Sequence, residues 1–196
     1  MHFAASARRW ALDCLYGPKD VTRHWTRSPA LRVAVDFDRH ALCGVALREP
    51  LPKLSRMGRA HDPKRASLGL FEYPDDGLWF SEENGTVACF VLCFHGSGGS
   101  PLKYESFRGE CRFSGRRFRL TADTKESDLL EVFGEPWWRI VEDGEPTLYY
   151  EHPGVEWQVI FTPAGRLSTV ELSIHAELAD PEARRQYGIT REWAVG

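Results

Sequence analysis

A glycine-rich segment that follows an apolar run has the residue types of a catalytic loop. Residues 91–94 are apolar, and they lead into the loop His95–Ser100, which contains three glycines. Backbone N–H groups of such a loop can face the oxyanion that develops during acyl transfer. Under this hypothesis the chain is a small hydrolase, and replacing His95 or Ser97 would remove its activity.

The same loop resembles the oxyanion loop of the α/β-hydrolases, which also need a Gly-x-Ser-x-Gly nucleophile elbow further along the chain. No such elbow follows residue 101. A phosphate-binding role is equally unsupported, because no Gly-Lys-Ser/Thr follows and no helix pattern begins at residue 101. A flexible Gly/Ser linker over residues 95–108 is therefore the preferred interpretation, and the small hydrolase remains an alternative.

The cysteines and histidines do not have the spacing of metal ligands. Cys89 and Cys93 would point to one face of a strand but lie about 13 Å apart at ~3.3 Å per residue. The seven histidines follow no metal-binding pattern. Five cysteines, an odd number and mostly within apolar segments, are typical of buried free thiols in a cytoplasmic protein. We expect no metal, no cofactor and no catalytic residue.

Aromatic and acidic residues gather in the second half of the chain, on segments that read as neighbouring strands. Trp and Tyr are favoured anchors of protein interfaces, and acidic neighbours would steer a basic partner. In the competing interpretation the aromatic residues fill the core and the acids form the solvated face. The predicted partner-binding residues are Trp137, Trp138, Glu142, Asp143, Glu145, Tyr149, Glu151 and Glu156.

Charge and hydropathy exclude several classes of partner. The net charge is -3 with a pI of about 6.2, which disfavours a nucleic-acid binder because such proteins need a basic face. Residues 1–32 carry a net charge of +4 and residues 109–174 a net charge of -5. The N-terminus lacks the pattern of a signal peptide, and no segment approaches a membrane span. We therefore expect a cytoplasmic protein that binds neither membrane nor nucleic acid.

An internal repeat runs through the sequence, covering roughly 33–94 and 109–174. Around the middle of each half, similar residues recur at a constant spacing of 76 positions, and corners rich in proline and glycine follow in the same order. The matched residues are Phe37 with Phe113, Leu42 with Phe118, Leu54 with Leu130, Met57 with Phe133, and Gly58 with Gly134. The sequence thus predicts two tandem copies of one small unit.

Each copy reads as a strand or hairpin, a helix and an antiparallel meander, which has three strands in the basic unit and four strand segments in the second copy. In the second copy, alternation around Ser114 and Gly115 predicts the hairpin, and a helix starts at Asp123 or Thr124 and stops at Gly134. Strands follow over 138–141, 148–151, 155–161 and 167–174. In the first copy the helix near residue 55 is weak, and residues 87–94 are apolar on both faces, which predicts a central buried strand.

Segments outside the repeats complete the expected architecture. The N-terminal segment 1–32 is expected to be helical, with an amphipathic helix over residues 4–16. Asp180-Pro181 fits the start of a helix within the C-terminal segment 175–196, which ends in a tail. We expect an α+β protein in which the two units form a continuous or back-to-back antiparallel sheet. A pocket between the units, lined by Trp79, Phe90 and Trp157, would suit a small molecule or lipid.

The second unit resembles a known family of small domains. Its Asp128-Leu129-Leu130, Phe133-Gly134 and Pro136 pattern with the strands that follow is similar to the α+β domains of the BamE/SmpA type. That resemblance implies a non-enzymatic domain that docks to other proteins. In general style the chain also resembles bacterial immunity proteins, which implies an inhibitor that neutralises a basic toxin or enzyme.

Overall fold

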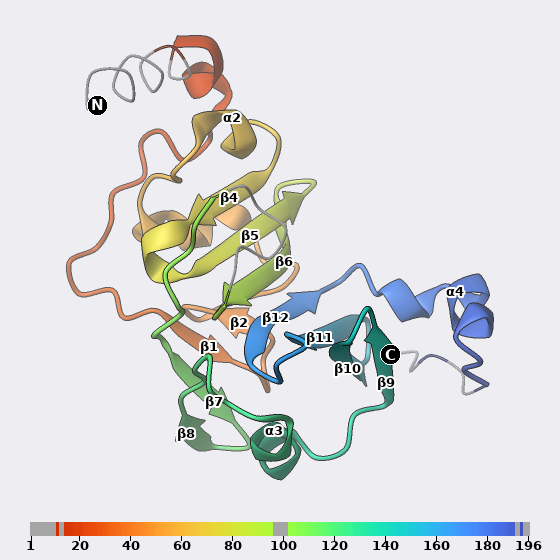
Figure 1. Cartoon of the computed structure of the whole chain (residues 1–196). Helices are drawn as coiled ribbons and strands as arrows, with labels where there is room; N and C mark the ends of the chain where they lie inside the picture. The colour runs from red at the N-terminus through yellow and green to blue at the C-terminus, as the bar shows by residue number, and fades with distance from the viewer. Residues whose placement is uncertain (1–10, 12–13, 96–101, 191–192, 194–196) are drawn as a thin grey trace.

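Two β-sheets form the framework of the fold, and each sheet takes strands from both halves of the sequence (Figure 1). The computed structural model describes residues 11, 14–95, 102–190 and 193. The larger sheet is antiparallel throughout, in the order β4-β5-β6-β12-β11-β10-β9. Its strands are β4 (Leu70–Tyr73), β5 (Leu78–Glu83), β6 (Thr86–Cys93), β9 (Trp138–Glu142), β10 (Glu145–His152), β11 (Val155–Phe161) and β12 (Leu167–Ser173).

The smaller sheet has five strands in the order β3-β2-β1-β7-β8. Its central pair, β1 and β7, is parallel and joins the two halves, with Val35 opposite Cys111. This pair corrects the expectation of an all-antiparallel arrangement. The strands are β1 (Ala34–Asp36), β2 (Ala41–Leu42), β3 (Val45–Ala46), β7 (Glu110–Phe113) and β8 (Arg116–Phe118).

Short helices connect and cover the sheets. The weak helix expected in the first half is a 3-10 helix, η2 (Leu51–Met57), and the helix of the second half is α3 (Glu126–Phe133). Helix α3 begins two or three residues later than expected, where the Asp128 carboxylate accepts the Lys125 N–H at 2.9 Å. The remaining helices are η1 (Gly17–Lys19), α2 (Pro63–Ala66), η3 (Pro74–Asp76), η4 (Glu177–Ala179) and α4 (Pro181–Gln186).

The two ends of the chain follow the sequence patterns as far as they are described. Asp180 caps α4 by accepting the Glu182 N–H at 3.1 Å, with Pro181 at the first helical position as expected. Of the expected helix over 4–16, residues 11 and 14–16 are helical and the rest lies outside the described residues. In the described part of the chain, no helix combines the length and the apolar character that crossing a bilayer requires.

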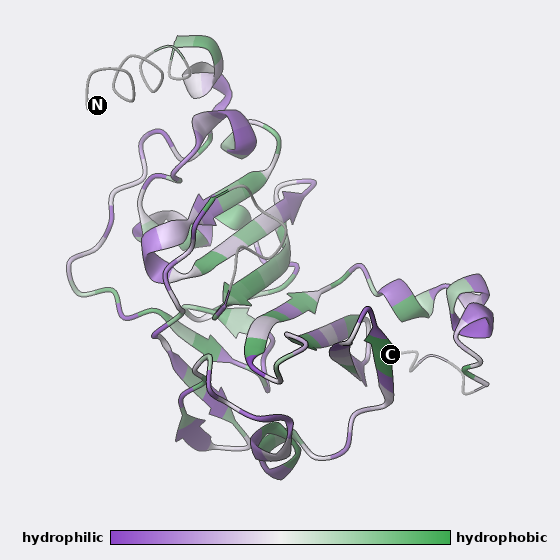
Figure 2. Ribbon diagram, in the orientation of Figure 1, coloured by the Kyte–Doolittle hydropathy of each residue, from purple (hydrophilic) through white to green (hydrophobic). Residues whose placement is uncertain are grey.

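One hydrophobic core fills the space between the two sheets. Phe37 and Phe113 from the smaller sheet contact Trp157 of β11, with ring centroids 5.2 and 5.8 Å apart. Strand β6 is an inner strand of the larger sheet, between β5 and β12, and is buried on both faces, as its continuous apolar run predicts. Figure 2 shows this apolar character along β6 and the hydrophilic character of β8.

The segment that precedes β7 packs against the larger sheet. Tyr104 and Phe107 are 6% and 2% exposed, and the Tyr104 hydroxyl donates to Glu72 at 2.9 Å. Gly77 allows this approach, because a Cβ there would lie 2.4 Å from the Phe107 nitrogen. Residues 102–107 are therefore a packed strap, and the expectation of a flexible linker is wrong for them; residues 96–101 lie outside the described chain.

A tyrosine closes the helix end in each half of the molecule. The Tyr73 hydroxyl donates to the Gly58 carbonyl at 2.7 Å, and the Tyr150 hydroxyl donates to the Gly134 carbonyl at 3.1 Å. Both glycines end a helix with a positive φ, 83° and 80°. This conformation favours glycine over residues with a Cβ.

Candidate interaction surface

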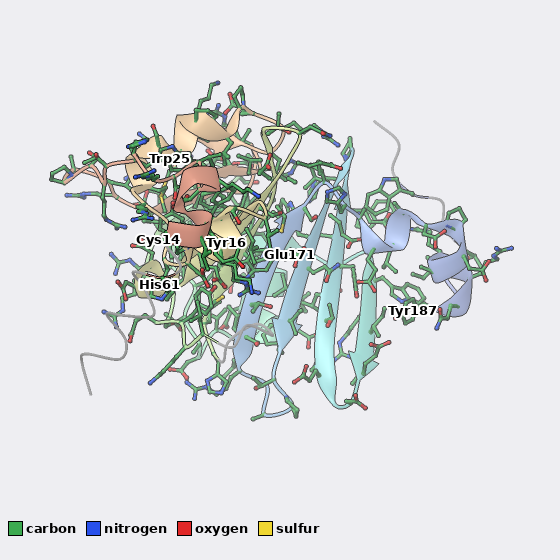
Figure 3. The ribbon with its side chains drawn as sticks, turned by 90° about the horizontal axis from the view of Figure 1, so that it is seen from above. Cys14, Tyr16, Trp25, His61, Glu171 and Tyr187 are labelled. Atoms are coloured by element: carbon green, nitrogen blue, oxygen red, sulfur yellow. The ribbon has the colours of Figure 1, made fainter. Side chains whose placement is uncertain are left out.

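The eight residues predicted to bind a partner do lie on neighbouring strands, but they divide between the interior and the surface. Strands β9, β10 and β11 are adjacent in the larger sheet, and Glu151 lies directly opposite Glu156. Side chains of successive strand residues point to opposite faces. Figure 3 shows these strands side by side, with Tyr187 labelled between them and α4.

The C-terminal segment covers the aromatic part of the predicted surface. Tyr149 is 5% exposed and forms a hydrophobic cluster with Ile140, Leu178 and Ile189. Trp138 packs against the same cluster and is partly buried. Tyr149 is therefore an internal anchor for the C-terminal segment, and the prediction that it faces a partner is wrong for the structure as folded. Trp137 is also partly buried.

Two predicted acidic residues also hold the C-terminal segment. Glu151 is 5% exposed and pairs with Arg184 of α4, whose Nη1 lies 2.5 Å from the carboxylate oxygen. Glu156 is fully buried, and its carboxylate accepts the backbone N–H groups of Glu177 and Leu178, both at 3.1 Å. Burial raises the pKa of Glu156. Both carboxylates bind the chain itself, so their predicted place on an exposed face is wrong.

The other three acids stand on the surface at the turn between β9 and β10. Glu142, Asp143 and Glu145 are exposed, and Asp143 and Gly144 have φ values of 51° and 81°, typical of a type I′ hairpin turn. The neighbouring Val141 is 51% exposed. We call residues 141–146 the acidic hairpin.

The acidic hairpin keeps its negative charge. Among the described residues no Lys or Arg lies within ion-pair distance of Glu142, Asp143 or Glu145, and the only hydrogen bond that these carboxylates accept within that part of the chain comes from the Tyr187 hydroxyl, which donates to Glu142 at 2.9 Å. The nearest arginine in sequence, Arg139, pairs instead with Glu126 of α3 at 2.9 Å. The hairpin therefore offers three carboxylates that a basic partner can approach.

A second charged hairpin was not recognised from the sequence. Residues 108–119 contain five arginines and one glutamate, a net charge of +4, and all five arginines are exposed. We call β7 and β8 with their turn, residues 110–118, the basic hairpin. A net charge counted over 109–174 conceals it, because the acids that follow outnumber the arginines; a shorter counting window would have revealed it.

Two surface hollows flank the basic hairpin. The one near its tip has a volume of about 460 Å³ and is lined by Phe113, Phe118, Val132 and the arginines 116 and 117. The other, about 500 Å³, lies where Arg32, Arg108 and Arg119 meet Arg27. In this second hollow, Asp76 holds Arg27 with two hydrogen bonds, and Asp75 and Glu110 place two further carboxylates among the other arginines, so we assign no site there.

The pocket expected between the two units is not formed by the residues proposed for it. Phe90 and Trp157 are 0% and 1% exposed and belong to the core between the sheets. Trp79 packs on the opposite face of the larger sheet, beside Cys89 and Cys93. The predicted lining is therefore wrong. Trp79 lies opposite Val91 in the β5–β6 register and points to the same face of the sheet, whereas Phe90, the residue before Val91, points to the other face.

The sequence candidates for chemistry remain apart. Cys89 and Cys93 are buried, and burial raises the pKa of the Cys93 thiol to about 12. Cys14 is exposed, unlike the other four thiols. Within the described ranges no group of three or more His, Cys, Asp or Glu side chains is placed to hold a metal ion. His95 is exposed and the rest of its loop lies outside those ranges.

A histidine pair lies at the junction of the two halves. The His152 ring lies 4.0 Å from the Trp157 ring and 5.2 Å from the His40 ring, measured between centroids. Burial, with a smaller contribution from His40, lowers the pKa of His152 to about 4. Arg48 closes the junction by donating to the Gly154 carbonyl at 2.8 Å. The pair stays neutral near pH 7.

Comparisons with known proteins leave the family of this chain open. No family model matches the sequence, and neither the curated proteins nor the solved structures contain a match.

Proposed function

We propose that this chain is a non-enzymatic protein-binding module, and more specifically an immunity or inhibitor protein that neutralises a basic toxin or enzyme. The observation that carries the proposal is the acidic hairpin, whose carboxylates are exposed and unpaired among the described residues. The partner surface is narrower than the sequence predicted. It comprises Glu142, Asp143 and Glu145 with the exposed Val141.

The charge around this hairpin supports a basic partner. Residues 126–156 contain nine acids and one arginine, a net charge of -8, and two of those acids are internal. Such a field accelerates encounter with a basic protein and disfavours acidic ones. Two charges near 4 Å interact by about 1 kcal/mol in water, so several acids are needed for selectivity.

The hairpin also carries an electrostatic cost that folding does not require. Glu142 and Glu145 are directly opposite each other in the β9–β10 register. Like charges at opposed positions destabilise a strand pair, by up to about 1 kcal/mol. A binding role gives a reason for keeping both, because a basic partner would relieve the repulsion.

Two finer properties belong to the same proposal. We infer that the two halves arose by duplication, which the matching tyrosine-to-glycine bonds at Gly58 and Gly134 support. We also infer that the protein works in a reducing bacterial cytoplasm. Its free thiols, four of them buried, support that inference.

Capture experiments with charge variants test the function. The tagged chain is compared with Glu142→Lys/Glu145→Lys and with a control of equal charge change, Glu83→Lys/Glu182→Lys, whose two sites are exposed elsewhere. We expect the parent and the control to retain one basic protein from lysate of the source organism in near-equal amounts, and the hairpin variant to lose it. Equal retention by all three would refute the proposed surface.

A further inference from the structure

The basic hairpin has a charged face that the fold does not neutralise. Arg112 and Arg117 lie directly opposite each other in the β7–β8 register, a like-charge pair that destabilises the hairpin. Arg117 approaches Glu110 at 3.5 Å. For Arg112 and Arg116, no carboxylate of the described chain lies at ion-pair distance.

The hollow at the tip of this hairpin combines an apolar floor with a cationic rim. Phe113, Phe118 and Val132 supply the apolar lining, and Arg116 and Arg117 supply the charge. Both phenylalanines are held in place by the ring of Phe133, at 5.2 and 5.8 Å between centroids. The hollow is therefore preformed, and its rim suits a negatively charged group.

The acidic hairpin has the complementary chemistry. Glu142 and Glu145 lie directly opposite each other and share one face of the hairpin, and the neighbouring Val141 is 51% exposed. β9 and β8 are each the last strand of their sheet, so each has one side without a neighbouring strand. Unpaired strand edges are the usual places where another chain adds to a sheet.

We propose that the acidic hairpin of one copy docks on the basic hairpin of a second copy. Glu142 and Glu145, which share one face of the acidic hairpin, then lie against the arginines at the rim of the hollow. The contact joins two different surfaces, so each pair of copies leaves one acidic and one basic hairpin unoccupied. Such a contact forms a closed ring or an open chain of copies, according to its rotation.

A nucleic acid fits the same hairpin less well. Proteins that bind single-stranded nucleic acids offer aromatic faces on which bases can stack. The ring of Phe118 is already stacked on Phe37, with centroids 6.1 Å apart, and also contacts the ring of Phe133. The net charge of -3 opposes a long polyanion as well. A second copy supplies a segment with three exposed carboxylates, those of Glu142, Asp143 and Glu145.

Self-docking does not depend on the basic partner proposed above. A basic partner would compete with it, because both would occupy the acidic hairpin. The purified chain alone tests the self-contact, so its failure leaves the proposed function untouched.

Sedimentation velocity with two charge-reversed variants provides the test. One variant, Arg116→Glu/Arg117→Glu, loses the basic surface, and the other, Glu142→Lys/Glu145→Lys, loses the acidic surface. The parent should associate as its concentration rises toward about 1 mM, a range set by the weak affinity of small polar contacts. Association should weaken between about 0.1 M and 1 M salt, as the Debye length falls from about 10 Å to about 3 Å.

The mixture of the two variants gives the decisive result. Each variant alone should stay monomeric, and an equimolar mixture should associate again, because an intact acidic hairpin meets an intact basic hairpin and the two reversed surfaces are complementary as well. A control, Lys19→Glu/Arg23→Glu, should associate like the parent. A monomeric parent at all concentrations, or a mixture that stays monomeric, overturns the proposal. If circular dichroism shows a misfolded variant, the glutamine versions at the same four positions replace it, with the same expectations.

Discussion

The basic and acidic hairpins have the same backbone design and opposite charge. Each has a two-residue turn with positive φ, at Ser114-Gly115 and at Asp143-Gly144, and each places like charges directly opposite each other. They differ in how they are anchored. The basic hairpin sends Phe113 and Phe118 into the main core, whereas the acidic hairpin is backed by the C-terminal segment. The turn residues thus determine the backbone of each hairpin. The facing charged residues are not needed for that conformation and are available for binding.

The largest expected effect is the loss of stability when the C-terminal segment that backs the acidic hairpin is weakened and the core contacts of the basic hairpin are left intact. Arg184→Ala leaves Glu151 as an uncompensated buried charge, and breaking a buried pair in this way costs about 3–5 kcal/mol. We expect that loss in urea unfolding, with faster amide hydrogen exchange in β9 and β10 and unchanged exchange in β7 and β8. The neighbouring Arg185→Ala, at an exposed pair, should change stability by less than about 0.5 kcal/mol. Equal exchange changes in both hairpins would contradict this division.

The pH dependence of stability tests the other end of β10. Burial disfavours the charged form of His152 and lowers its pKa to about 4. A histidine in the unfolded chain has a pKa of about 6.5. The unfolded chain therefore binds more protons between these values, and the free energy of unfolding should fall as pH is lowered from about 6.5 to 4. His152→Gln should flatten this slope in urea titrations. An unchanged slope would show that the buried His152 does not contribute to the pH dependence of the free energy of unfolding.

Turn substitutions test whether the two hairpins share one design. Gly115 and Gly144 have φ values of 74° and 81°, so Ala at either position should cost about 1–2 kcal/mol. Asn, which tolerates this conformation, should cost less at both positions. Thermal unfolding of the four variants provides the comparison. Clearly unequal costs at the two glycines would show that the turns are not equivalent.

The smallest effect concerns the like-charge pairs. Arg117→Thr and Glu145→Thr each remove one of two facing charges and introduce a residue favoured in strands. We expect each to raise the free energy of unfolding by about 0.2–1 kcal/mol, while Glu145→Thr weakens partner binding. Destabilisation by either change would indicate that the pair contributes to the fold instead.

Local sequence patterns predicted most elements, while long-range packing decided the site. The alternation around Ser114-Gly115 and the apolar run of β6 predicted strands that the structure contains. Nothing near Tyr149 or Glu156 indicates that residues 177–190 cover them. These contacts join segments that are distant in sequence. No local sequence pattern around Arg184 predicts that it pairs with Glu151.

Binding of the captured basic partner to the purified chain tests the central claim most directly. Isothermal titration should give a dissociation constant at least about tenfold weaker for Glu142→Lys/Glu145→Lys than for the parent, equivalent to about 1.4 kcal/mol. The control Glu83→Lys/Glu182→Lys should bind like the parent. Equal affinity of all three proteins would show that the acidic hairpin is not the docking surface.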